Sequence, residues 1–241
     1  MREAFRTFFY QRAGFAKSAP QAGSGWTGMA SHLGPGQDSE ARLFSAPDDA
    51  PTARDLRGGS HDAGDYNQHT NWTADQCRTL LISCTENPDA WGDDFGIPES
   101  GNGVPDVQDE AKWALDWLLR MQGKDGSVLS VLGRGSVSPP SAAKGPSRYG
   151  PASTSATLSA AGTFAFAALV FRESPAPGPM PNALKRRRSL PGAEPRPIRR
   201  RCSTTMTNGP VRKTMAPGRP PRLADGRADC RLHRGRAEPG I

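Results

Sequence analysis

The chain has 241 residues, which is enough for one or two domains of ordinary size, and its net charge is +7. That charge is uneven: residues 1–172 carry a net charge of −4 and residues 173–241 a net charge of +11, so the basic character belongs to the tail alone. A difference of this size predicts a boundary between two segments. The four cysteines match no zinc-binding spacing and do not resemble a disulfide framework.

The first predicted element is a helix over residues 2–15, where apolar side chains recur at helical spacing. This segment does not resemble a signal peptide, because Glu3 and Arg6 interrupt it and no apolar run of about 7–15 residues follows. We therefore expect either a cytoplasmic protein or a sequence whose natural N-terminus is missing. Residues 16–60 are rich in Gly, Pro, Ser and Asp and predict a long loop, which in a compact domain is usually functional or disordered.

Two clearer helices follow. Residues 72–86 predict the second, with Cys77 and Cys84 on one face but roughly 10.5 Å apart along the axis, too far for a disulfide. The third follows a polar, Gly-rich loop: Pro105 suits its first position, acidic residues occupy its first turn, and Gly123 can end it. Its apolar residues form two stripes, which predicts packing on two sides.

Residues 154–171 predict a fourth helix of 18 residues without a charge. A membrane span is the alternative, since about 18 apolar residues suffice, but five Ser or Thr residues and two Phe-Ala repeats favour a buried inner helix. Beyond Arg172 the apolar periodicity ends, and the last 69 residues contain 12 Pro and 7 Gly. Such a segment cannot bury enough surface to offset its chain entropy, so we expect residues 173–241 to be disordered.

Candidate chemistry lies in the stretch 58–66, GGSHDAGDY, where Asp62 and Asp65 stand on either side of Ala-Gly. In a turn, this spacing can aim both carboxylates at one point, where they could hold and deprotonate a water molecule. The same residues also fit an Asp-rich turn or an incomplete calcium loop, although a calcium loop needs further acidic ligands and a Glu at its twelfth position. The motif alone leaves these alternatives open.

Four segments, in the right order, resemble glycoside hydrolase family 9. FFYQRAGF (8–15) is similar to the family's FYYQRCG-type segment, and GGSHDAGDY to its GGWHDAGDY-type motif. PESGNGVPDVQDEAKWALDWLLRMQ (98–122) is similar to its PESGNGIPDLLDEAKWGLDWLLKMQ-type segment, and residues 148–171 resemble a later Thr- and Ala-rich helix. The ordered matches span residues 4–171, which makes the resemblance specific.

The resemblance implies an all-α fold, here a partial (α/α)6 barrel, that hydrolyses β-1,4-glucan with inversion. By position, Asp65 matches the general base and Asp62 the partner that helps to orient the attacking water. Inversion also needs a general acid about 6.5–9.5 Å from the base, which the family takes from a Glu close to the end of the domain. Nothing in residues 173–241 resembles that acid motif. We therefore expect residues 1–172 to be a truncated, impaired catalytic domain and the basic tail to be an out-of-frame translation.

Several family members bind zinc near this site through two Cys and two His. The Cys positions fall at Ala13 and Ser31, and the remaining His32 and His61 are too few for a structural zinc site, which has four ligands. We therefore expect no metal and no cofactor. His61 and Tyr66 are candidate substrate-binding residues within the acid motif; the alternatives are hydrogen bonding to the loop for His61 and core packing for Tyr66.

Taken together, the resemblance implies a secreted or periplasmic monomer that acts on β-1,4-glucan, with no membrane and no specific nucleic-acid partner. Two other functions stay open. One is a non-catalytic carbohydrate-binding remnant. The other is a nucleic-acid-binding arm, because the Arg and Lys clusters of residues 173–241 would attract phosphates without sequence preference.

Overall fold

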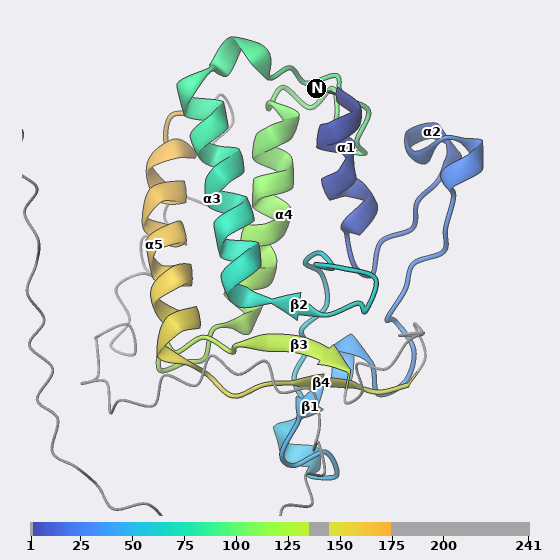
Figure 1. Ribbon diagram of the computed structural model, residues 1–241, viewed down its shortest axis with the longest axis vertical. Coiled ribbons are helices and arrows are strands. Elements are labelled where there is room, and N and C mark those ends of the chain that lie inside the picture. Colours follow the sequence, from blue (N-terminus) through green and yellow to red (C-terminus); the bar gives the residue numbers. More distant parts are fainter. Residues whose placement is uncertain (1, 135–144, 175–241) are drawn as a thin grey trace, which may run out of the picture. The chain divides into compact units, whose positions relative to one another are not determined.

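The computed structural model describes residues 2–134 and 145–174. Its long helices run side by side, with α3 packed against both α4 and α5 and with α1 beside α4 (Figure 1). Their bounds are α1 (Arg2–Gln11), α3 (Thr70–Glu86), α4 (Asp106–Met121) and α5 (Thr154–Val170). All four expected helices are therefore present, each within a few residues of its predicted bounds.

Helix α4 is buried on two sides, as its two apolar stripes predicted. Leu115 and Leu118 from one stripe and Trp117 from the other are almost completely buried. Burial of each such side chain contributes about 1.5–3 kcal/mol, so this helix is a main support of the core. Pro105 is its N-cap, with an extended backbone (ψ 131°), and not its first helical residue.

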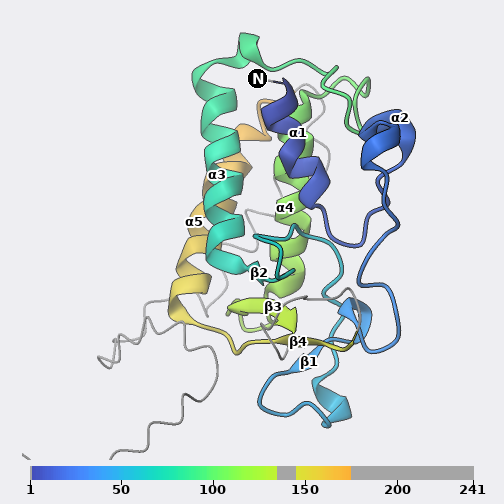
Figure 2. The same ribbon diagram turned by 45° about the vertical axis from the view of Figure 1, so that its right-hand side comes forward.

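The expectation of an all-α fold is wrong in one respect, because four short strands form a mixed sheet at one end of the helices (Figure 2). Their order is β1–β4–β3–β2; β1 pairs parallel with β4, and the other pairs are antiparallel. The bounds are β1 (Arg42–Leu43), β2 (Gln68–His69), β3 (Val131–Arg134) and β4 (Ser147–Tyr149). Strands of two to four residues are too short to show the period-two alternation by which a strand is recognised in a sequence.

The predicted loop over residues 16–60 is mostly irregular but contains β1 and several single turns of helix. These turns are α2 (Ala19–Ala22) and the 3₁₀ turns Ser24–Trp26, Asp38–Glu40 and Ala50–Thr52; a further 3₁₀ turn, Pro88–Ala90, follows α3. The long segment between α1 and α3 is thus folded against the sheet through β1.

Three other expectations concern the two cysteines, a membrane span and the basic tail. Cys77 and Cys84 are free, buried thiols, and burial raises the pKa of Cys77 to about 12. None of the helices in residues 2–134 and 145–174 has the length and apolar character needed to cross a bilayer. The tail expected over residues 173–241 lies, from residue 175 onward, outside the described residues.

Candidate active site

The segment that carries both candidate acids begins at Gly59 and is held at its start by the end of α1. The Ala13 amide donates a hydrogen bond to the Gly59 carbonyl (2.8 Å), and the His61 amide donates to the Gln11 carbonyl (2.9 Å). These bonds form an isolated antiparallel bridge between residues 11–13 and 59–61. The chain therefore enters the acid motif from a fixed position.

Helix α4 holds the same segment through two tryptophans. Trp113 Nε1 donates to the Gly59 carbonyl (2.8 Å), and Trp117 Nε1 donates to the Leu56 carbonyl (3.2 Å). Gly59 has a φ of +72°, and a Cβ at this position would lie 2.6 Å from Cγ of Trp117. Both the backbone conformation and the close approach of the indole require glycine here.

A buried ion-pair cluster fixes the end of α1. The Arg12 side chain has no solvent exposure, and its Nη1 and Nη2 donate to the two carboxylate oxygens of Glu99 at 2.9 and 3.0 Å. Its Nε donates to Oε2 of Glu110 on α4 (3.1 Å), and the guanidinium lies 4.8 Å from the ring centroid of Trp113. Arg12 thereby joins α1, the loop before α4 and α4 itself beneath the acid motif.

One guanidinium serves two carboxylates in this cluster, and burial and charge shift the pKa values of its members in opposite directions. Burial lowers the pKa of Arg12, but the charges of Glu110 and Glu99 outweigh it and the net shift is upward. Burial raises the pKa of Glu110 to about 7 although Arg12 opposes the shift, and burial also raises the pKa of neighbouring Asp109 to about 6. Burial and the nearby charge of Arg12 lower the pKa of Lys17 to about 8.

Asp62 is the more enclosed of the two candidate acids. Its side chain is 7% exposed, and its Oδ2 lies 3.6 Å from Nε2 of His69. Burial raises the pKa of Asp62; His69 opposes the shift, and the charge of Asp65 adds to it. The two carboxylates are therefore close enough to influence each other.

Asp65 is half-buried, and Asn67 fixes its carboxylate. The Asn67 amide donates to Oδ1 of Asp65 (3.3 Å), and Asn67 Nδ2 donates to Oδ2 (2.7 Å). The carbonyl of the same Asn67 accepts a hydrogen bond from the Asp62 amide (3.0 Å). Asn67 thus closes one turn, here called the acid turn (residues 62–67), that contains both acids. Sequence reasoning missed Asn67 and His69, because neither residue type stands out beside the DAGD motif.

His61 and Tyr66, the candidate substrate-binding residues, pack on each other and on His32. The ring centroids are 5.0 Å apart for His61 and Tyr66, 4.9 Å for His61 and His32, and 5.4 Å for Tyr66 and His32. Tyr66 and His32 both have positive φ, 59° and 63°, a conformation that is uncommon outside glycine. His61 is buried, and contact of either residue with substrate stays a prediction.

The residues present do not fit the family's zinc site. Ala13 and Ser31 provide no thiolate, and the Ser31 hydroxyl is hydrogen-bonded to Nδ1 of His32 (2.8 Å). In the part of the chain that the structure describes, no three His, Cys, Asp or Glu residues are grouped so that they could hold a metal ion.

Comparisons with known proteins agree with the four resembling segments. The chain is 29% identical over 149 residues to a cellulose 1,4-beta-cellobiosidase of Acetivibrio thermocellus, a match that covers 54% of this chain and 17% of that protein. It is 32% identical over 144 residues to endoglucanase C of Cellulomonas fimi, covering 54% and 13%. The crystal structure of a metagenome-derived glycoside hydrolase family 9 endoglucanase superposes with a TM-score of 0.66 at 31% identity, covering 80% of this chain and 36% of that one.

The chain therefore spans less than a fifth of these curated relatives and about a third of the solved structure. Within that span, the sequence model that describes glycosyl hydrolase family 9 matches residues 1–178, which include the end of α1, the acid turn, α4 and α5. Because this match covers well over half of the chain, the protein belongs to glycosyl hydrolase family 9.

Proposed function

We propose that the acid turn is the water-activating side of an inverting glycoside hydrolase site for β-1,4-glucans. In this proposal Asp65 is the general base and Asp62 helps to hold the attacking water. The observation that carries it is the acid turn itself, in which Asn67 binds the Asp65 carboxylate and the Asp62 backbone at once. Family membership and the cellulase names of two relatives supply the substrate class.

The proposed step is a single displacement. A water molecule beside Asp62 attacks the anomeric carbon, its proton passes to the carboxylate of Asp65, and the bond from that carbon to the leaving oxygen breaks, with inversion. Two hydrogen bonds from Asn67 hold the Asp65 carboxylate in one orientation, which limits the reorganisation needed when the water is deprotonated. Burial is the main cause of the raised pKa of Asp62, and the charge of Asp65 adds to it.

The leaving oxygen of a glucan is a poor leaving group and depends on a general acid, whose help is commonly worth 10²–10⁴-fold. We propose that residues 1–172 supply the base of the reaction and not the general acid, since none of their segments resembles the family's acid motif. A glycoside with an activated phenol as leaving group needs no such proton. Such a substrate therefore tests the base independently of the acid.

The experiment measures dinitrophenol release from 2,4-dinitrophenyl β-cellobioside by the full chain. We expect hydrolysis that Asp65→Asn reduces by about 100-fold or more, because the substituted amide cannot accept the proton. Asp75→Asn is the matched control, since Asp75 is exposed on α3 and forms an ion pair with Arg78, three residues further along the same helix. Full activity in Asp65→Asn, or none in the unaltered chain, would contradict the proposal, and an initial β-anomer product would contradict inversion.

Family membership also supports two proposals, one about the location of the protein and one about its oligomeric state. We propose that the protein acts outside the cytoplasm and as a monomer, as the resemblance implied. Size-exclusion chromatography with light scattering checks the second proposal, for which a mass near 25.7 kDa is expected.

A further inference from the structure

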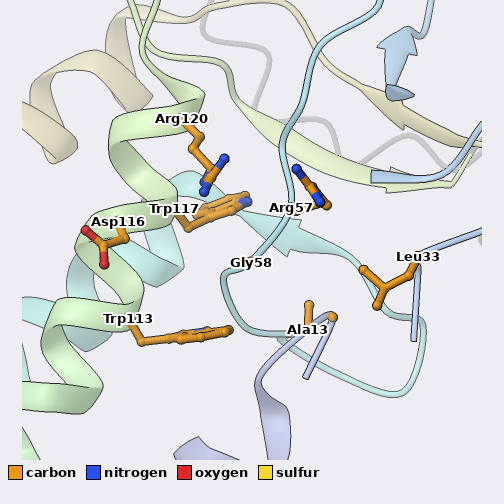
Figure 3. Close-up of a pocket in the computed structure, with 9 residues that line it drawn as sticks. Ala13, Leu33, Arg57, Gly58, Trp113, Asp116, Trp117 and Arg120 are labelled. Atoms are coloured by element: carbon orange, nitrogen blue, oxygen red, sulfur yellow. The ribbon is translucent and has the colours of Figure 1, made fainter. Parts of the chain in front are cut away.

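A pocket of about 430 Å³ lies between α4 and the irregular segment that leads into Gly59 (Figure 3). Its volume falls within the range of small-molecule sites, about 300–1,000 Å³. The residues that define its chemistry are Trp113, Asp116, Trp117 and Arg120 on α4, and Arg57 and Gly58 opposite. Neither Asp62 nor Asp65 lines it, so the pocket is distinct from the proposed catalytic groups.

Trp113 is partly exposed and forms the accessible aromatic wall of this pocket, whereas Trp117 is 1% exposed and offers little surface of its own. Figure 3 shows the two indoles one above the other along α4, with Gly58 beside them. Both indole N–H groups are already engaged, that of Trp113 by the Gly59 carbonyl and that of Trp117 by the Leu56 carbonyl. Both rings are therefore fixed in place, and the exposed part of Trp113 provides apolar surface against which the C–H face of a sugar ring can pack.

The rim of the pocket is polar but nearly neutral. Arg57 forms a bidentate ion pair with Asp55 (2.9 and 2.6 Å), and Arg120 lies 3.5 Å from the same carboxylate. Asp116 pairs with Lys112 at 2.6 Å. All of these side chains keep about 40–50% of their exposure, so each retains donors or acceptors for a ligand.

A fixed aromatic wall with a neutral, multiply hydrogen-bonding rim suits a neutral polyhydroxylated ring. A free anion would meet the carboxylate of Asp116, and a free cation would meet the guanidinium groups of Arg57 and Arg120. A pyranose meets no such repulsion, because its neutral hydroxyl groups can bond to charged side chains that remain paired. The chemistry of the pocket therefore favours a sugar over a charged ligand.

We propose that this pocket binds one glucosyl unit of a β-linked glucan, as an accessory site beside the acid turn. The choice of glucose rests on the proposed function, whereas the preference for a neutral sugar rests on the pocket alone. Gly58 forms part of the pocket and directly precedes Gly59, where the chain enters the acid motif. A glucan held here would therefore lie next to the segment that carries both acids.

The test is a titration of the full chain with cellotriose, followed by NMR of the five tryptophan indole N–H signals. We expect the signals of Trp113 and Trp117 to move saturably at millimolar sugar, while those of Trp26 and Trp91, which lie outside the pocket, serve as internal controls. Arg57→Ala combined with Arg120→Ala should weaken binding about tenfold or more, since two partly exposed donors are lost. Asp116→Asn provides a milder second variant, and circular dichroism checks that each variant folds.

Asp65→Asn separates this proposal from the catalytic one. We expect it to leave the affinity for cellotriose at the pocket unchanged although it abolishes hydrolysis of the activated cellobioside. Absence of any shift at Trp113 and Trp117 up to about 10 mM cellotriose would overturn the pocket proposal. Binding that is lost in Asp65→Asn but kept in the arginine variants would also overturn it, and would leave the catalytic proposal intact.

Discussion

The Arg12 cluster and the acid turn both contain a carboxyl group whose pKa is raised mainly by burial, yet they are held in different ways. Arg12 binds partners 87 and 98 residues away in sequence and joins three segments of the fold. In the acid turn, the hydrogen bonds of Asp62 and Asp65 to Asn67 stay within five residues. The comparison teaches that long-range ion pairs join the end of α1, the loop before α4 and α4 itself, here called the frame. The two candidate acids lie on a locally closed turn that this frame positions.

The largest expected effect is on the frame. Arg12→Met would leave Glu110 buried without its counter-charge, and breaking a buried ion pair in this way typically costs about 3–5 kcal/mol. Urea unfolding measures the loss. Lys112→Met on the same helix is the matched control, because its exposed pair with Asp116 is worth only about 0.3–0.5 kcal/mol. Equal losses in the two variants would show that the buried ion pair contributes no more to the free energy of unfolding than the exposed one.

The next effect tests the junction between frame and turn. Gly59→Ala places a Cβ against the Trp117 ring at a positive φ, and we expect a loss of about 2–4 kcal/mol from overpacking and backbone strain together. Gly58→Ala shares the positive φ but meets no atom within 4 Å, so only the strain, about 1–2 kcal/mol, remains. Thermal unfolding of both variants should therefore rank them; the reverse order would show that the Trp117 contact is not tight.

A pH titration sharpens the comparison further. Because the pKa of Glu110 is raised to about 7, the folded protein binds a proton between about pH 4.5 and 7 that the unfolded chain has released. The contribution of Glu110 to stability must then fall as the pH rises through this window, by on the order of 3 kcal/mol, and level off above it. Glu110→Gln should flatten that slope in urea unfolding followed from pH 5 to 8. Asp109, with its pKa raised to about 6, adds to the slope only in the lower part of the window, and an unchanged slope in Glu110→Gln would refute the assignment.

The smallest expected effect on stability belongs to the acid turn. Asp65→Asn keeps an oxygen that can accept from Asn67, and the side chain is only half-buried, so we expect a loss below about 1 kcal/mol. Chemical denaturation checks this value against the large loss expected for activity on the activated cellobioside. A loss as large as that of Arg12→Met would place Asp65 in the frame instead of the turn.

The sequence predicted the helices well because each shows helical periodicity over ten or more residues. The first helix stops at Gln11, short of the predicted residue 15, because the backbone at Arg12 leaves the helix to pair with Ser60. The sheet could not be predicted, since strands as short as β1 and β2 owe their existence to partners that are distant in sequence.

The two candidate acids were predicted from one motif, whereas the contacts that organise them were not. Nothing in the sequence indicates that Arg12 would meet Glu99 and Glu110, because such pairing depends on how α1 and α4 pack. The role of Asn67 could not be predicted for a different reason, because it depends on the turn that the hydrogen bonds of Asn67 close. The pocket on α4 likewise follows from the fold, since the sequence predicted only that the apolar stripes of this helix pack on two sides.

The most direct test of the central claim, that Asp62 and Asp65 share one site, is a ¹³C NMR titration of the Asp62 carboxyl in the unaltered chain and in Asp65→Asn. We predict that the pKa of Asp62 lies above its usual value and falls, without returning fully, once the charge of Asp65 is removed, because burial also contributes to the shift. A pKa of Asp62 that is the same in both proteins would contradict the claim, since it would mean that the two carboxylates do not meet.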